Sequence, residues 1–159
     1  MSFLRFLMLL SLIVWVGGVI FFPVLAATAF SVLPTTHLAG QVVRRSLWIL
    51  HWMGMVSGVL FLASSMLYQR LSSSRGHVFA AVHLLVCGML ALTLVSQFGI
   101  LPRMDTLRTS VADIGSLPAD NPVHIEFDVL HVWSTRVEAG VLILGLAATY
   151  LVARQSKAG

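Results

Sequence analysis

Imidazole and carboxylate side chains recur at helical spacing in the last third of the chain. Polar residues stand at successive intervals of four, three, four and three positions, namely His124, Asp128, His131, Thr135 and Glu138. Residues three and four apart share one face of an α-helix, so this pattern predicts a polar stripe. Imidazole and carboxylate groups on one helix face can converge on a transition metal ion. The candidate metal ligands are therefore His124, Asp128, His131 and Glu138.

A further histidine, His51, lies in an apolar segment at a similar depth. At about 1.5 Å per helical residue, His51 is about 28 Å from Arg70. Measured from Arg154 in the same way, His131 is about 34 Å away and Glu138 about 24 Å. Helices that face each other across a bundle can hold a cofactor in the core, and histidine is a common haem ligand. We therefore take His51 and His131 as candidate ligands of a b-type haem.

These patterns also fit interpretations without a cofactor. The stripe could be a hydrated seam where the last helix leaves a membrane, with Glu138 bonded to a neighbouring helix. Gly54 and Gly58, one and two turns from His51, could leave room for a flat macrocycle, but Gly-x-x-x-Gly is also a common close-packing motif. Cys87 is the single cysteine, and no nucleophile elbow or phosphate loop is present. A non-enzymatic protein is therefore expected.

The composition shows which elements must position these groups. Of the 159 residues, 58% are hydrophobic and 10% are charged, against roughly 45–50% apolar and about 25% charged in soluble domains. The net charge of +4 comes from basic residues near the ends of apolar runs rather than from a basic stripe. The composition therefore excludes a soluble domain and a nucleic-acid binder, and it predicts an integral membrane protein with the lipid bilayer as its surroundings.

A membrane-spanning helix needs about 20 mainly apolar residues, and the chain offers four such segments. They are predicted at about 4–27, 46–69, 76–101 and 128–153, with a long connection at about 103–121. We expect the first segment to be a retained span rather than a signal peptide, because its apolar run is too long. Asn121 and Pro122 form a good helix start for the last span. The predicted fold is a single all-α domain, 1–159, an up-down-up-down four-helix transmembrane bundle.

Several segments together carry a family resemblance, namely 15–22, 33–40, 45–51, 101–105 and 127–134. On these the chain resembles the bacterial domain of unknown function 4149 family, and it is similar to the eukaryotic transmembrane protein 205 family. The resemblance implies an integral membrane helical bundle in a bacterial inner membrane. Basic residues are nearly balanced between the two sides, and all six acids fall within 105–138. We expect both termini in the cytoplasm.

Three functions remain open at this point. The first is a binding module that holds haem or a metal ion in the outer half of the bundle, with His51 and His131 as ligands. The second is an accessory or structural subunit of a larger membrane complex. The third is a small ion or solute transporter that uses Glu138 and Arg136, because ionisable groups within a membrane are costly and mark functional sites. In each case the polar stripe should face the bundle interior.

Overall fold

The computed structural model describes residues 2–72, 77–111 and 114–155. Its long helices are α1 (Ser2–Val32), α2 (Thr36–Ser72), α3 (His77–Val95) and α5 (Pro122–Gln155). A π-helix, η1 (Ser96–Ile100), continues α3 directly into α4 (Leu101–Ser110), and a short 3-10 helix, η2 (Ile114–Ser116), precedes α5. The described residues contain no strand, so the prediction of an all-α fold is confirmed.

Four helical segments are long and apolar enough to cross a membrane, as predicted: Ser2–Val32, Thr36–Leu71, Ala81–Ser110 and Pro122–Arg154. The third helical segment runs through η1 and α4, so the first part of the predicted connection is helical. The last helix begins at Pro122, and Asn121 caps it by accepting a hydrogen bond from the Val123 amide at 2.9 Å. Gly76 and residues 112–113 of the predicted span and connection lie outside the described residues.

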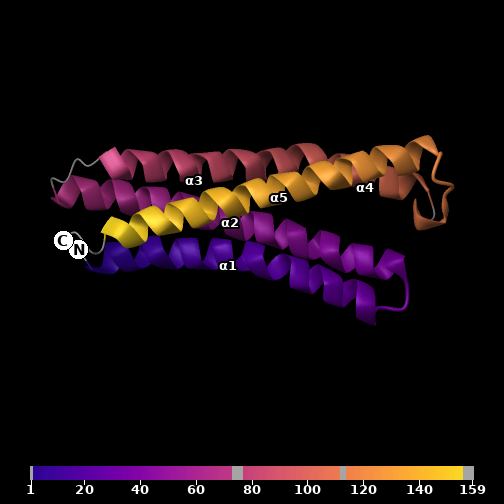
Figure 1. The fold of residues 1–159 in the computed structure, drawn as a ribbon, viewed down its shortest axis with the longest axis horizontal. Coiled ribbons are helices and arrows are strands. Elements are labelled where there is room, and N and C mark those ends of the chain that lie inside the picture. The colour runs from indigo at the N-terminus through magenta and orange to yellow at the C-terminus, as the bar shows by residue number, and fades with distance from the viewer. Residues whose placement is uncertain (1, 73–76, 112–113, 156–159) are drawn as a thin grey trace.

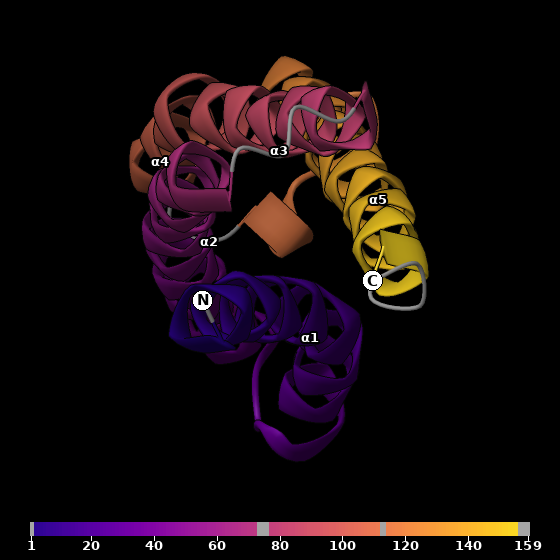
Figure 2. The ribbon, with the colours of Figure 1, turned by 90° about the vertical axis from the view of Figure 1, so that its left-hand side faces the viewer.

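The four long helices form a ring in the order α1, α2, α3 and α5 (Figure 2). The most extensive packing joins α1 to α2 and α3 to α5, while α1 also packs on α5 and α2 on α3. As a result, α2 and α5 face each other across the bundle. The start of α1 and the end of α5 lie at one end of the molecule, here called the terminal end, and α4 lies at the other, here called the α4 end (Figure 1). The α1–α2 pair diverges from the α4–α5 pair toward the α4 end (Figure 1).

Apolar side chains fill the bundle between its middle and the terminal end. Trp15, Phe61 and Met89 are almost fully buried there. A Cβ atom built on Gly58 would lie 2.7 Å from the Trp15 ring, and one on Gly54 would meet the same ring. The expected room for a macrocycle beside these glycines is therefore taken by the Trp15 indole, and the close-packing interpretation of the motif is the correct one.

Arginine side chains lie over aromatic rings at two levels of the bundle. At the terminal end, the Arg5 guanidinium lies 5.1 Å from the Tyr68 ring centre, and that of Arg154 lies 5.8 Å from the Tyr150 ring centre. Arg5 also donates a 2.9 Å hydrogen bond from Nε to the Tyr68 hydroxyl. Aromatic and arginine side chains concentrate where a membrane helix meets the headgroups. These pairs therefore lie where a membrane boundary is expected.

Two more pairs mark the second boundary. Arg45 lies 4.8 Å from the Trp48 ring centre on α2, and Arg136 lies 5.4 Å from the Trp133 ring centre on α5. At about 1.5 Å per residue, the two levels are about 30 Å apart along α2 and about 26 Å along α5, close to the thickness of a bilayer core.

Candidate functional site

His51 occupies the centre of the bundle, toward the α4 end. Its side chain is buried, with 2% exposure, and both ring nitrogens have partners. Nε2 lies 2.6 Å from Oε1 of Glu138 on α5, and Nδ1 lies 2.9 Å from Oε1 of Gln97 on η1. Three elements therefore meet at one imidazole. Glu138 thus bonds a residue of another helix, as the interpretation without a cofactor expected, and its partner is His51 on α2, the helix opposite α5.

The hydrogen-bond partners of His51 define the possible proton arrangements of this triad, because the role of each ring nitrogen depends on the tautomer. In the arrangement with the Gln97 amide oxygen toward Nδ1, Nδ1 carries a hydrogen and donates it to that oxygen. The proton between Nε2 and Glu138 then belongs either to an imidazolium that donates to a carboxylate or to a carboxylic acid that donates to a neutral imidazole. Both arrangements have no net charge. A neutral pair suits a membrane interior, where an unpaired charge costs several kcal/mol.

Gln97 was not among the predicted site residues. It is 6% exposed and is placed by η1, a π-helical turn between α3 and α4. Such wide turns are rare and frequently lie at functional sites. The signal available in the sequence was an amide inside the uncharged run 76–102, which a search for ionisable groups passes over.

A cavity of about 350 Å³ adjoins the triad on the side of the α4 end. It lies between α2 and the η1–α4 segment, and it is lined by Arg44, Arg45, Trp48, Gln97, Phe98, Leu101, Pro102 and Asp105. Arg44 Nε and Asp105 Oδ1 form an ion pair of 2.5 Å that ties α2 to α4 beside this cavity. Gln97 lines the cavity and also bonds His51, so the cavity lies one side chain away from the His51–Glu138 pair.

The remaining stripe residues lie apart from His51. His124 Nε2 is 3.5 Å from Asp128 Oδ2, and His124 Nδ1 is 3.2 Å from the Leu117 carbonyl oxygen. His131 is exposed and stacks on Phe127 with ring centres 6.5 Å apart. No three metal-ligating side chains gather anywhere in residues 2–72, 77–111 and 114–155. The predicted metal ligands are thus divided between two places.

The expectation that the whole stripe faces an enclosed interior is wrong for Asp128 and His131, which are exposed. The helical spacing is correct, since Ser134 on the same helix is buried and Glu138 is only 15% exposed. The reason lies in the bundle: the two helix pairs diverge toward the α4 end, so this face of α5 loses its neighbours there (Figure 1). Haem ligation by His51 and His131 stays a prediction, and it would require His51 to give up Gln97 or Glu138.

The model of the domain of unknown function DUF4149 matches residues 10–112. That stretch includes His51, Gln97 and every residue that lines the cavity, and it ends before Glu138. No curated protein and no solved structure matches the chain. Since the match covers well over half of its length, the chain belongs to the DUF4149 family.

Proposed function

We propose that this protein is a proton-coupled carrier of small solutes, with His51 and Glu138 as its proton site. The observation that carries the proposal is the contact of 2.6 Å between the two side chains, which are 2% and 15% exposed. Ionisable groups within a membrane-spanning segment are expensive to keep, and proton relays of transporters are built from them. Of the three functions open from the sequence, transport is the one this contact favours.

Access to the pair from one side only supports the same function. Toward the α4 end, the Gln97 side chain connects the pair to the cavity. Toward the terminal end, the bundle is closed by the tightly packed side chains of Trp15, Phe61 and Met89. A central site that is open to one side and sealed from the other is the arrangement that alternating access requires. In this proposal the α4 end faces outward from a bacterial inner membrane.

Coupling follows from the charge of the pair. Gain or loss of one proton changes the net charge at the centre of the bundle by one unit, and each charge state favours the conformation that solvates it better. A proton bound from one side can therefore shift the equilibrium between conformations that open to either side. In an accessory subunit, the His51–Glu138 contact would contribute only to the stability of the fold. The carrier and the accessory subunit therefore make different predictions.

A first experiment tests the proton site. The purified full chain is titrated while its infrared carboxyl stretching band is recorded. We expect a buried carboxyl signal that changes with pH in the unmodified protein, persists in Glu126→Gln and is absent from Glu138→Gln. A signal that survives in Glu138→Gln would remove Glu138 from the proposal. An absorption spectrum of the same sample is the check on the alternative, because a Soret band would support haem binding instead.

A second experiment tests alternating access. Ser64 is buried on α2 on the terminal side of the apolar layer. In a Cys87→Ala background, Ser64→Cys should react with a water-soluble maleimide at a rate that depends on pH. Adding Glu138→Gln should abolish that dependence, because the pair can no longer change its charge by proton exchange. A labelling rate that ignores pH in both proteins would favour the accessory subunit.

A further inference from the structure

Positive charge exceeds negative charge around the cavity at the α4 end. Arg44, Arg45 and Asp105 line it, and Arg108 lies within electrostatic reach of Arg44 and Asp105. Two guanidinium groups and one carboxylate therefore line the cavity, and the guanidinium group of Arg108 lies three residues after Asp105 on α4. The neighbouring Arg103 is balanced separately by Glu126, at 2.7 Å from Nε to Oε1.

Two of these arginines lack an anion. Arg44 pairs with Asp105, whereas Arg45 lies over the Trp48 ring and Arg108 lies 5.0 Å from the Phe127 ring centre. Within the described residues, neither Arg45 nor Arg108 forms an ion pair. A guanidinium group on an aromatic face still presents N–H donors along its edge, in a planar fork that matches two oxygens of a phosphate or carboxylate.

The inner wall of the cavity adds a neutral donor. Gln97 uses its Oε1 atom for His51 at 2.9 Å, and its amide nitrogen makes no hydrogen bond within the described part of the chain. The Gln97 residue is buried, with 6% exposure. A donor in the wall of a cavity can bind an acceptor that enters the cavity.

We infer that this cavity binds a phosphate-type oxyanion, which is held by Arg45 and the Gln97 amide in its lining and attracted by Arg108, three residues after Asp105 on α4. A volume of about 350 Å³ accommodates such a group with bound water. The Trp48 ring places the site at the membrane boundary, so the oxyanion is either free phosphate or the phosphate of a lipid headgroup. Both sources share the chemistry that the site recognises.

This inference rests on the proposed function for its role, since the oxyanion is the solute that accompanies the proton. An anion next to Gln97 adds negative charge within two side chains of Glu138. Uptake of one proton by the His51–Glu138 pair offsets that charge, so binding of the anion and binding of the proton favour each other. The two ligands would be carried together.

The test measures binding to the full chain in alkyl maltoside micelles, which contain no phosphate. Inorganic phosphate is titrated by calorimetry in one arm, and phosphatidic acid in mixed micelles is added in the other. We expect Arg45→Gln and Arg108→Gln each to weaken binding about tenfold or more. Arg103→Gln, on the same end of the molecule, should bind as the unmodified protein does. Arg45→Lys keeps the charge and should bind with intermediate affinity, which excludes a folding defect as the cause.

Each outcome has a defined meaning. Phosphate binding that needs Arg45 and Arg108 supports the site with a free anion, and the same dependence for phosphatidic acid alone supports it with a lipid. Absence of binding in both arms, or an equal loss in Arg103→Gln, overturns the inference. A pH indicator in weak buffer records proton uptake in the same titrations. Binding without proton uptake would overturn the proposed function and leave the oxyanion site intact.

Discussion

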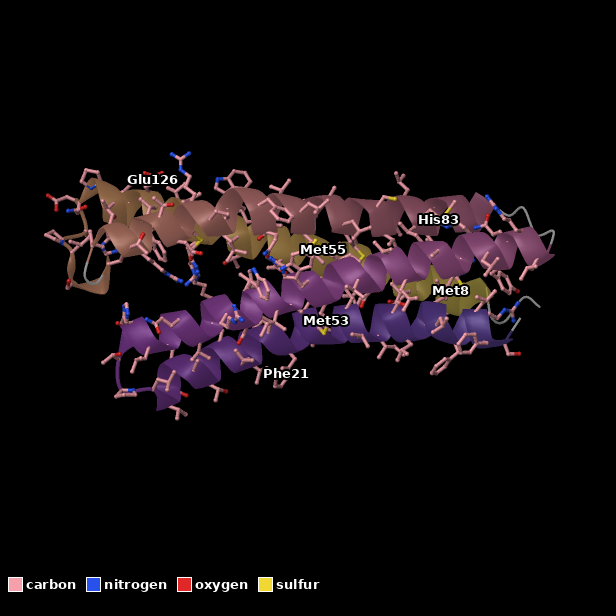
Figure 3. The ribbon with its side chains drawn as sticks, turned by 180° about the vertical axis from the view of Figure 1, so that it is seen from behind. Met8, Phe21, Met53, Met55, His83 and Glu126 are labelled. Carbon is pink, nitrogen blue, oxygen red and sulfur yellow. The ribbon has the colours of Figure 1, made fainter. Side chains whose placement is uncertain are left out.

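His51 on α2 and Glu138 on α5 meet at 2.6 Å although their helices stand opposite each other in the ring. The contact therefore crosses the centre of the bundle rather than a helix interface. Figure 3 labels Met53 and Met55, which follow His51 on α2. A polar contact in this position joins the two helix pairs, so its loss should lower the stability of the whole bundle.

Removal of the Glu138 carboxylate should destabilise the protein. Glu138→Ala leaves His51 Nε2 buried without a partner, which costs about 1–3 kcal/mol. Glu138→Gln keeps a hydrogen-bonding group at the same place and should cost less. Thermal unfolding in detergent measures both. Glu126→Ala, an exposed residue on the same helix, should change stability by less than about 1 kcal/mol, and an equal loss there would show that the central contact has no special weight.

Gln97 should affect the stability of the protein through its hydrogen bond to His51. Gln97→Met keeps the size of the side chain but removes the acceptor of the Nδ1 hydrogen, so we expect a loss of about 1–3 kcal/mol and a shifted carboxyl band of Glu138. The matched change is Gln41→Met, since Gln41 also bonds a histidine, His37, but on an exposed surface. If both variants lost stability equally, the position of Gln97 would have no specific role.

The glycines under His51 should not tolerate a side chain. Gly54→Ala and Gly58→Ala push a methyl group into the Trp15 ring, and overpacking of this kind costs about 1–3 kcal/mol. Gly17→Ala meets no atom within 4 Å and should be neutral or stabilising by up to about 1 kcal/mol, because alanine favours a helix. Melting temperatures of the three variants test the assignment, and tolerance of Gly58→Ala would reopen the space for a larger group.

Topology can be read with reporters that are active only outside the cytoplasm. A fusion after Gly115, near the α4 end, should be active, and a fusion after Ser72, at the terminal end, should be inactive. The opposite pattern would invert the orientation and place the cavity on the cytoplasmic side. Activity at both positions would contradict the four crossings.

The sequence was sufficient for the features that depend on length and spacing. The four long helices follow from uncharged apolar runs, and counting helical rise from basic residues gives His51 a depth between those of His131 and Glu138. That count did not distinguish Glu138, which contacts His51, from His131. The exposure of the His131 side chain could not be predicted from length and spacing. Helical spacing places it on the same face as Glu138, but whether that face has a neighbour depends on how far the helix pairs diverge.

The position of Gln97 and the presence of the cavity could not be predicted from residue spacing, for a different reason. A π-helical turn has no sequence signature comparable to a cap or a proline, so the side on which Gln97 lies is decided by packing between α3, α2 and α5. The Arg44–Asp105 ion pair joins two segments far apart in the chain, and such tertiary contacts follow from the fold rather than from local spacing.

The paired arginines and aromatic rings set the hydrophobic thickness of this protein. Tyr150 and Trp133 are about 26 Å apart along α5, a few ångströms less than an average hydrocarbon core. A bilayer of long-chain lipids would have to thin around the bundle, or the bundle would have to change its tilt to draw the rings to the headgroups. The length of the lipid acyl chains would therefore change the angle between the two helix pairs. That angle in turn sets the width of the opening at the α4 end.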